Sequence, residues 1–133
     1  MQIKNTYPPN WEQIKLFNPP KNAVFPYGDI IYNPSKEEIP PDIQFHEQIH
    51  QEQQRKFPSP DLWWQKWRMD KDFRKEQEVH AFGEQLKFVK KFYPAKASKE
   101  ALDEMANNLS NNYKLNISKH QAESLIRHYD KKT

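Results

Sequence analysis

Two histidines four residues apart, with a glutamate directly after the first, are the residues of this chain best suited to chemistry. They lie in the segment His46-Glu47-Gln48-Ile49-His50, which has the pattern H-E-x-x-H. On a helix, residues i and i+4 lie on one face a turn apart, so both imidazoles can reach one zinc ion at about 2.0–2.1 Å. Glu47 lies on the neighbouring flank, where its carboxylate can act on water without being a ligand. The motif therefore predicts a zinc site with His46 and His50 as metal ligands and Glu47 as the catalytic group.

A catalytic zinc ion takes three protein ligands, so another element has to supply the third. Two glutamates, Glu76 and Glu78, begin a downstream segment with helical periodicity. Glu76 is favoured because His80 follows at i+4, where it can orient a ligand by a hydrogen bond. Glu78 is the alternative, since it is closer to the apolar stripe of that helix, and His80 itself is a further candidate ligand. The competing interpretation is that both glutamates are solvated surface carboxylates.

Peptide hydrolysis also needs a donor that stabilises the developing oxyanion. Tyr27 and Tyr32 are the candidates, although each tyrosine can equally be a packing residue. His120 and His128 are further candidates that fall in a helix start and near a helix end. An extended peptide could pair antiparallel with the strand predicted near residues 29–32, as an added strand.

The chain resembles gluzincin-type zinc metallopeptidases, and more closely the small zincin-like proteins encoded by tailed phages and prophages. The resemblance covers about residues 23 to 93. It implies an acidic residue at the position of His80, so this chain departs from the pattern there. The matching segments are Tyr27-Gly28-Asp29-Ile30-Ile31-Tyr32-Asn33-Pro34, Pro40-Pro41 before the motif, Gln53-Gln54 after it, Trp63-Trp64, and Phe73-Arg74-Lys75-Glu76-Gln77-Glu78.

The resemblance implies a zinc-dependent metallopeptidase-like protein, with Zn²⁺ as cofactor and a peptide or protein as substrate. In that chemistry Glu47 takes a proton from water and passes it to the leaving amine. The alternative is a non-catalytic phage structural or assembly protein that keeps a structural zinc site and binds a phage or host protein. The chain has no apolar leader or membrane-length apolar run, so we expect a location in the host cytoplasm or the virion and no membrane partner.

A nucleic-acid-binding accessory protein is a third and less favoured interpretation. Three tryptophans, Trp63, Trp64 and Trp67, lie among lysines and arginines, and aromatic residues between cations can stack bases and hold phosphates. However, tryptophans at helical spacing usually pack in a core, and the net charge is only +3. We therefore predict that these rings pack inside the protein.

The elements that must position these residues follow from proline, capping and apolar periodicity. Ten of the 11 prolines precede residue 61, so an extended segment is expected over residues 1–40. The expected elements are a helical turn at 11–17, an edge strand within 23–33, and helices starting near 41, 60, 70–72, 98 and 118, the last with a Ser118–Gln121 capping box.

The predicted fold is a single, mainly helical α+β domain over residues 1–133 with a minimal zincin-like core. It comprises the proline-rich wrap and strand (1–40), the metal-site helices (41–93) and a C-terminal helical pair (98–129). Cysteine is absent, which excludes disulfides and thiolate ligands. Aliphatic residues are few and aromatic content is 14%, so we expect a thin aromatic core that zinc binding helps to stabilise.

Overall fold

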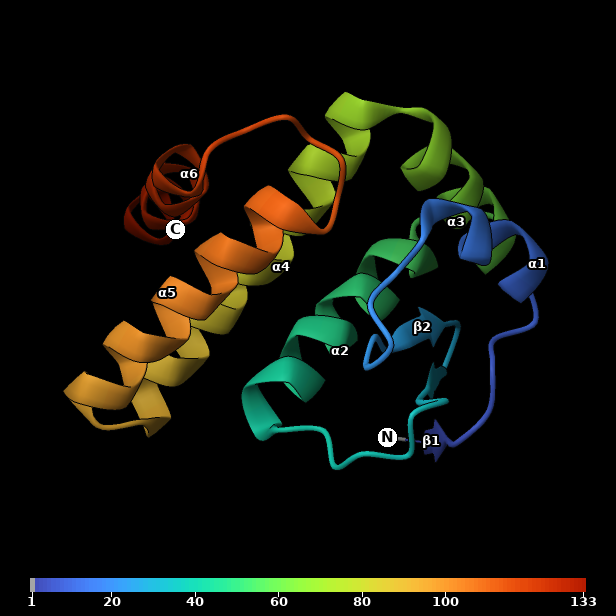
Figure 1. Ribbon diagram of the computed structural model, residues 1–133, viewed down its shortest axis with the longest axis horizontal. Helices are drawn as coiled ribbons and strands as arrows, with labels where there is room; N and C mark the ends of the chain where they lie inside the picture. The colour runs from blue at the N-terminus through green and yellow to red at the C-terminus, as the bar shows by residue number, and fades with distance from the viewer. Residues whose placement is uncertain (1) are drawn as a thin grey trace. The chain divides into compact units, whose positions relative to one another are not determined.

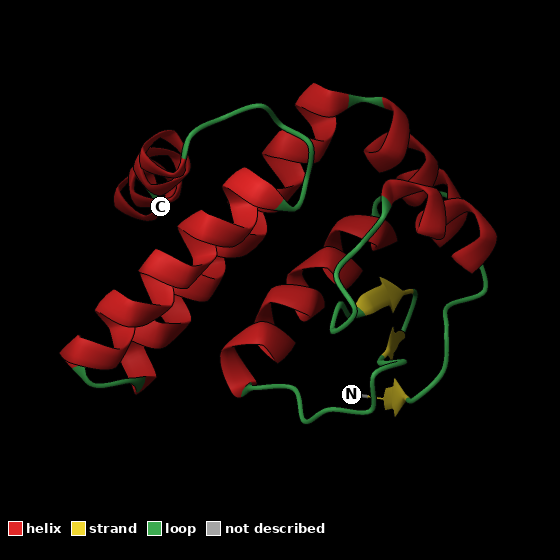
Figure 2. Cartoon of the chain, viewed as in Figure 1, coloured by secondary structure: helices red, strands yellow, loops and turns green. Residues whose placement is uncertain are grey.

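The computed structural model describes residues 2–133 and is mainly helical, with one small three-stranded sheet (Figure 2). This confirms the predicted α+β class. The chain divides into two compact units, Met1–Asp70 and Lys71–Thr133, and each is described by itself. The boundary falls inside the segment 41–93 that is predicted to carry the metal-site helices, and a single domain over 1–133 stays a prediction.

The first unit contains the sheet and the first helices (Figure 1). The strand order is β1-β3-β2, with β1 parallel and β2 antiparallel to the central β3. The helical turn expected at 11–17 is confirmed as a short α-helix followed by a 3-10 helix. The elements are β1 (Gln2–Lys4), α1 (Trp11–Ile14), η1 (Lys15–Phe17), β2 (Phe25–Tyr27), β3 (Ile30–Tyr32), α2 (Pro41–Arg55) and α3 (Pro60–Met69).

The region predicted as one strand is a hairpin of two short strands. The backbone φ of Gly28 is +61°, a value that residues with a side chain rarely adopt. Gly28 therefore allows the chain to turn between β2 and β3. Pro26 lies on the edge strand β2, as predicted from its missing N–H. The expectation that a peptide pairs with residues 29–32 is wrong, because β3 is bordered by β1 on one side and β2 on the other.

Helix α2, which carries the motif, begins where the sequence predicts. Pro41 occupies its first turn together with Asp42, which suits the positive end of the helix dipole. A buried glutamine near its end, Gln54, accepts a hydrogen bond from Gly28 N (2.8 Å) and donates one to the carbonyl of Pro26 (2.8 Å). This side chain therefore ties the last turn of α2 to the hairpin.

Helix α3 carries the aromatic core of the first unit. Its N-cap is Ser59, whose hydroxyl accepts from Leu62 N at 3.3 Å. Trp63, Trp64 and Trp67 are all buried, and their ring centroids lie 5.0–6.4 Å apart. The prediction that these rings pack inside the protein is confirmed, so they are not an exposed platform for stacking bases.

The second unit consists of helices α4 (Lys71–Phe92), α5 (Ala95–Asn111) and α6 (Lys119–Lys132). Apolar residues of all three helices meet in its core. The capping box at Ser118 and Gln121 is present with both of its hydrogen bonds. The buried core residues are Phe82, Leu86, Val89, Leu102, Met105, Ala106, Leu109, Leu115, Ala122 and Ile126.

Helix α5 begins three residues earlier than predicted. Pro94 occupies the N-cap position, and Ser98, the predicted start, lies inside the helix. The Ser98 hydroxyl instead donates to the carbonyl of Val89 at 2.9 Å, which links the start of α5 to the end of α4. A cap without a side-chain hydrogen bond leaves no sequence signal, which explains the error.

Helices α4 and α6 approach closely at a glycine. A Cβ at Gly83 would fall onto the ring of Tyr129, whose hydroxyl donates to Glu84 at 2.7 Å. This close approach requires glycine at position 83.

Among residues 2–133, no helix has the length and apolarity needed to cross a bilayer.

Candidate metal centre

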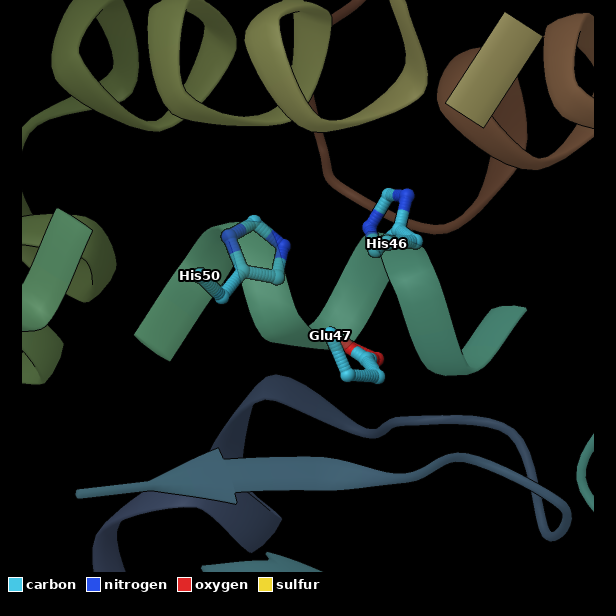
Figure 3. A group of neighbouring side chains, drawn as sticks. All are labelled: His46, Glu47 and His50. Atoms are coloured by element: carbon cyan, nitrogen blue, oxygen red, sulfur yellow. The ribbon is translucent and has the colours of Figure 1, made fainter. Parts of the chain in front are cut away.

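The motif residues lie in the middle of α2, on the two sides of the helix that the spacing predicts. Figure 3 shows the imidazoles of His46 and His50 leaving one side of α2, while Glu47 leaves toward the strands below. Residues i and i+4 differ by about 40° around a helix, and residues i and i+1 by about 100°. The helix therefore pairs the two imidazoles and places the carboxylate on their flank.

The three side chains form a compact donor group. One donor atom from each of His46, Glu47 and His50 lies within 4.8 Å of the other two. The imidazole centroids are 4.8 Å apart with the ring planes at 81°. Two donors on one tetrahedral zinc ion are roughly 3.4 Å apart, which falls within the 4.8 Å that bounds the separations here. Two imidazoles are ligands that zinc accepts, and the Glu47 carboxylate is the third member of this group.

Burial sets the electrostatic character of this group. His46, Glu47 and His50 are 5%, 6% and 3% exposed. A charge moved out of water is costly unless a hydrogen bond or an opposite charge compensates it. Such a cluster of buried, ionisable side chains is therefore a candidate functional site.

Gln53 orients the second histidine of the motif. Its Oε1 lies 2.7 Å from Nδ1 of His50, and both side chains are buried. An amide oxygen only accepts hydrogen bonds, so Nδ1 of His50 is the donor in this contact. The His50 ring also packs against Trp63, with centroids 5.2 Å apart. These contacts fix the orientation of the His50 ring.

The predicted third ligands lie on α4, in the second unit. Glu76 is exposed, whereas Glu78 is 2% exposed. His80 is half-buried, and its ring packs 5.4 Å from the ring of Tyr129. The structure does not decide among these residues, so the third ligand stays a prediction.

The two candidate oxyanion donors lie on the hairpin. Tyr27 hydrogen-bonds to Asp61, and burial, followed by this bond and the nearby charge, raises the pKa of Tyr27 above its ordinary value. Tyr32 is buried on β3. His120 and His128 are exposed on α6. Tyr27 thus already has a hydrogen-bond partner, and an oxyanion role for either tyrosine stays a prediction.

Sequence reasoning missed the polar residues that support the motif helix. Gln53 and Gln54 are both buried, and each makes specific hydrogen bonds, with His50 and with the hairpin respectively. Trp64 Nε1 also donates to the Pro26 carbonyl, at 2.9 Å. The sequence held one indication of this supporting role, because two consecutive glutamines, Gln53 and Gln54, follow the motif on the same helix.

Comparisons with protein-family models, with curated proteins and with solved structures found no match for the chain. The functional argument therefore depends on the donor group and its surroundings.

Proposed function

We propose that this chain is a zinc-dependent metallopeptidase-like protein that hydrolyses peptide bonds. The observation that supports the proposal is the buried group of His46, Glu47 and His50, whose donor atoms lie within 4.8 Å of one another. The two imidazoles are the proposed zinc ligands, with His50 binding through Nε2. The substrate class is a peptide or protein.

Each motif residue has a distinct part in the proposed reaction. Zinc in such a site supplies Lewis acidity and activates water. Glu47, on the flank of the imidazoles, accepts the proton of the attacking water and later delivers it to the leaving amine. Gln53 holds the His50 ring in the tautomer that a ligand needs, because its amide oxygen accepts the Nδ1 proton.

The proposed third ligand is a glutamate of α4. The sequence spacing favours Glu76, whereas burial favours Glu78, since a carboxylate that shares an ion with buried imidazoles must itself leave solvent. Glu76→Gln and Glu78→Gln separate the two assignments. We expect the true ligand's variant to lose about 10- to 100-fold or more in zinc affinity, and the other variant to bind as the wild type does.

A second candidate function is a structural or assembly protein with a structural zinc ion. The same burial favours it, because a catalytic site has to admit water and substrate, while a structural site is closed. In that case zinc stabilises the fold and Glu47 has no proton to transfer.

Peptide cleavage with a matched Glu47→Gln variant tests the proposal. The zinc-loaded wild type is incubated with a broad peptide library, and the products are identified by mass spectrometry. We expect cleavage that falls about 10²- to 10⁴-fold in Glu47→Gln, with bound zinc unchanged. An intact library with zinc bound would contradict the peptidase proposal and favour the structural role.

A further inference from the structure

A second concave site lies wholly within the second unit. A hollow of about 270 Å³ is bordered by the end of α4, the start of α5 and the end of α6. Its apolar floor includes Leu86 and Leu102, each 4% exposed. The volume is just below the roughly 300–1,000 Å³ of drug-sized ligand sites, so it suits a small aliphatic group.

The rim of this hollow is strongly basic. It holds Lys90, Lys99, Arg127 and Lys131 against a single acidic residue, Asp130. Lys90 pairs with Asp130 at 2.6 Å, and Arg127 lies 3.7 Å from Glu123. Lys99 and Lys131 have no ion-pair partner among residues 2–133, so the rim keeps an excess of positive charge.

Helix dipoles account for some of these cations but not for all. Lys90 and Lys131 lie in the last turns of α4 and α6, where lysine complements the negative end of a helix. Lys99 lies near the start of α5, where the helix end is itself positive, the first turn has no acidic residue and the N-cap makes no side-chain hydrogen bond. An anion at this position would relieve an unfavourable arrangement of charge.

We propose that this hollow binds a small amphipathic monoanion, a medium-chain aliphatic carboxylate, with its chain on Leu86 and Leu102 and its charge at Lys99 and Lys131. The concave apolar floor fits the chain, and the cationic rim complements the carboxylate. This site is distinct from the proposed metal centre, because none of its lining residues is a proposed metal ligand.

Methyl NMR of the full chain tests this site, with sodium octanoate as the probe. We expect the Leu86 and Leu102 methyl signals to shift saturably, with a Kd below about 1 mM. Acetate has the charge without the chain and octan-1-ol has the chain without the charge, so each should bind at least about tenfold more weakly. Hexanoate, two methylenes shorter, should also bind about tenfold more weakly.

Charge-reversal variants locate the carboxylate. Lys99→Glu and Lys131→Glu should each weaken octanoate binding about tenfold, because both remove an attraction and add a repulsion. Lys132→Glu is the matched control, since Lys132 is exposed on the same helix but does not line the hollow, and its Kd should stay within about twofold of wild type.

Three results would overturn the proposal. One is the absence of a saturable shift up to about 10 mM octanoate in a folded chain. Another is equal affinity for octanoate and octan-1-ol, which would show that the lysines take no part. The third is binding of an acidic peptide, with the same lysine dependence, where octanoate fails to bind, which would assign the surface to a protein partner.

Discussion

Gln54 is a buried polar side chain that holds the motif helix to the β2–β3 hairpin. It is 2% exposed and makes two hydrogen bonds to the hairpin, from Gly28 N and to the Pro26 carbonyl, both at 2.8 Å. Gln54→Met keeps most of the volume but removes both bonds. At about 1 kcal/mol for each bond, the free energy of unfolding should fall by about 2 kcal/mol. The Pro26 carbonyl keeps its bond from Trp64, which limits the loss.

Gln54→Ala adds a cavity to the lost hydrogen bonds. The substitution removes one methylene and the carboxamide group and leaves a cavity in their place, so we expect a total loss of about 3–4 kcal/mol. Glu52→Ala is the matched control on the same helix. Glu52 is exposed, and its removal should change the free energy of unfolding by less than about 0.5 kcal/mol.

Urea unfolding followed by tryptophan fluorescence measures these losses in the first unit. All four tryptophans of the chain lie at positions 11, 63, 64 and 67, so fluorescence reports this unit and far-ultraviolet circular dichroism reports both. A Gln54→Met variant within about 0.5 kcal/mol of wild type would refute the reasoning, because it would show that the two bonds do not hold α2 to the hairpin.

Two further predictions concern the second unit. Gly83→Ala should cost about 1–3 kcal/mol in thermal unfolding followed by circular dichroism, because the new methyl meets the Tyr129 ring, and an unchanged melting temperature would contradict the close approach. Burial, and next the hydrogen bond to Glu84, raise the pKa of Tyr129 well above its ordinary value near 10. The folded state thus favours the neutral phenol, so this stabilisation is complete below about pH 10 and is lost as the unfolded chain ionises above it. The stability difference between wild type and Tyr129→Phe should therefore fall progressively as the pH rises above about 10, and a constant difference would contradict the assignment.

Local signals in the sequence predicted the helices well. Pro41 with Asp42, Ser59 before Pro60, and the Ser118 capping box each begin a helix in the structure, because each acts within one turn. Helix α5 begins before its predicted start because Pro94 caps it without a side-chain hydrogen bond.

Contacts between residues far apart in the chain were not predicted from the sequence. Strand β1 was not expected, because three exposed residues carry no alternating pattern and gain their order only from β3. Gln54 and Trp64 both donate hydrogen bonds to the carbonyl of Pro26, although they follow it in the sequence by 28 and 38 positions. No local rule predicts such contacts, since they depend on the folded chain.

At the candidate metal centre, the spacing of residues in the sequence predicted which side chains are neighbours only within one helix. The pairing of His46 with His50 follows from 3.6 residues per turn, and the structure brings their donor atoms together with one from Glu47. The choice between Glu76 and Glu78 concerns another element, and helix periodicity alone does not decide it. The role of Gln53 also needed coordinates, because many side chains can point toward Nδ1 of a histidine.

Zinc content per chain, measured by mass spectrometry on purified wild type and histidine variants, tests the central claim most directly. We predict about one zinc ion per wild-type chain, and its loss in His46→Ala and His50→Ala. His120→Ala, at an exposed histidine of α6, should keep its zinc. A chelator that removes the ion should also lower the melting temperature of the first unit. A folded wild type that stays free of metal under zinc supplementation, or equal zinc binding in all three variants, would contradict the account.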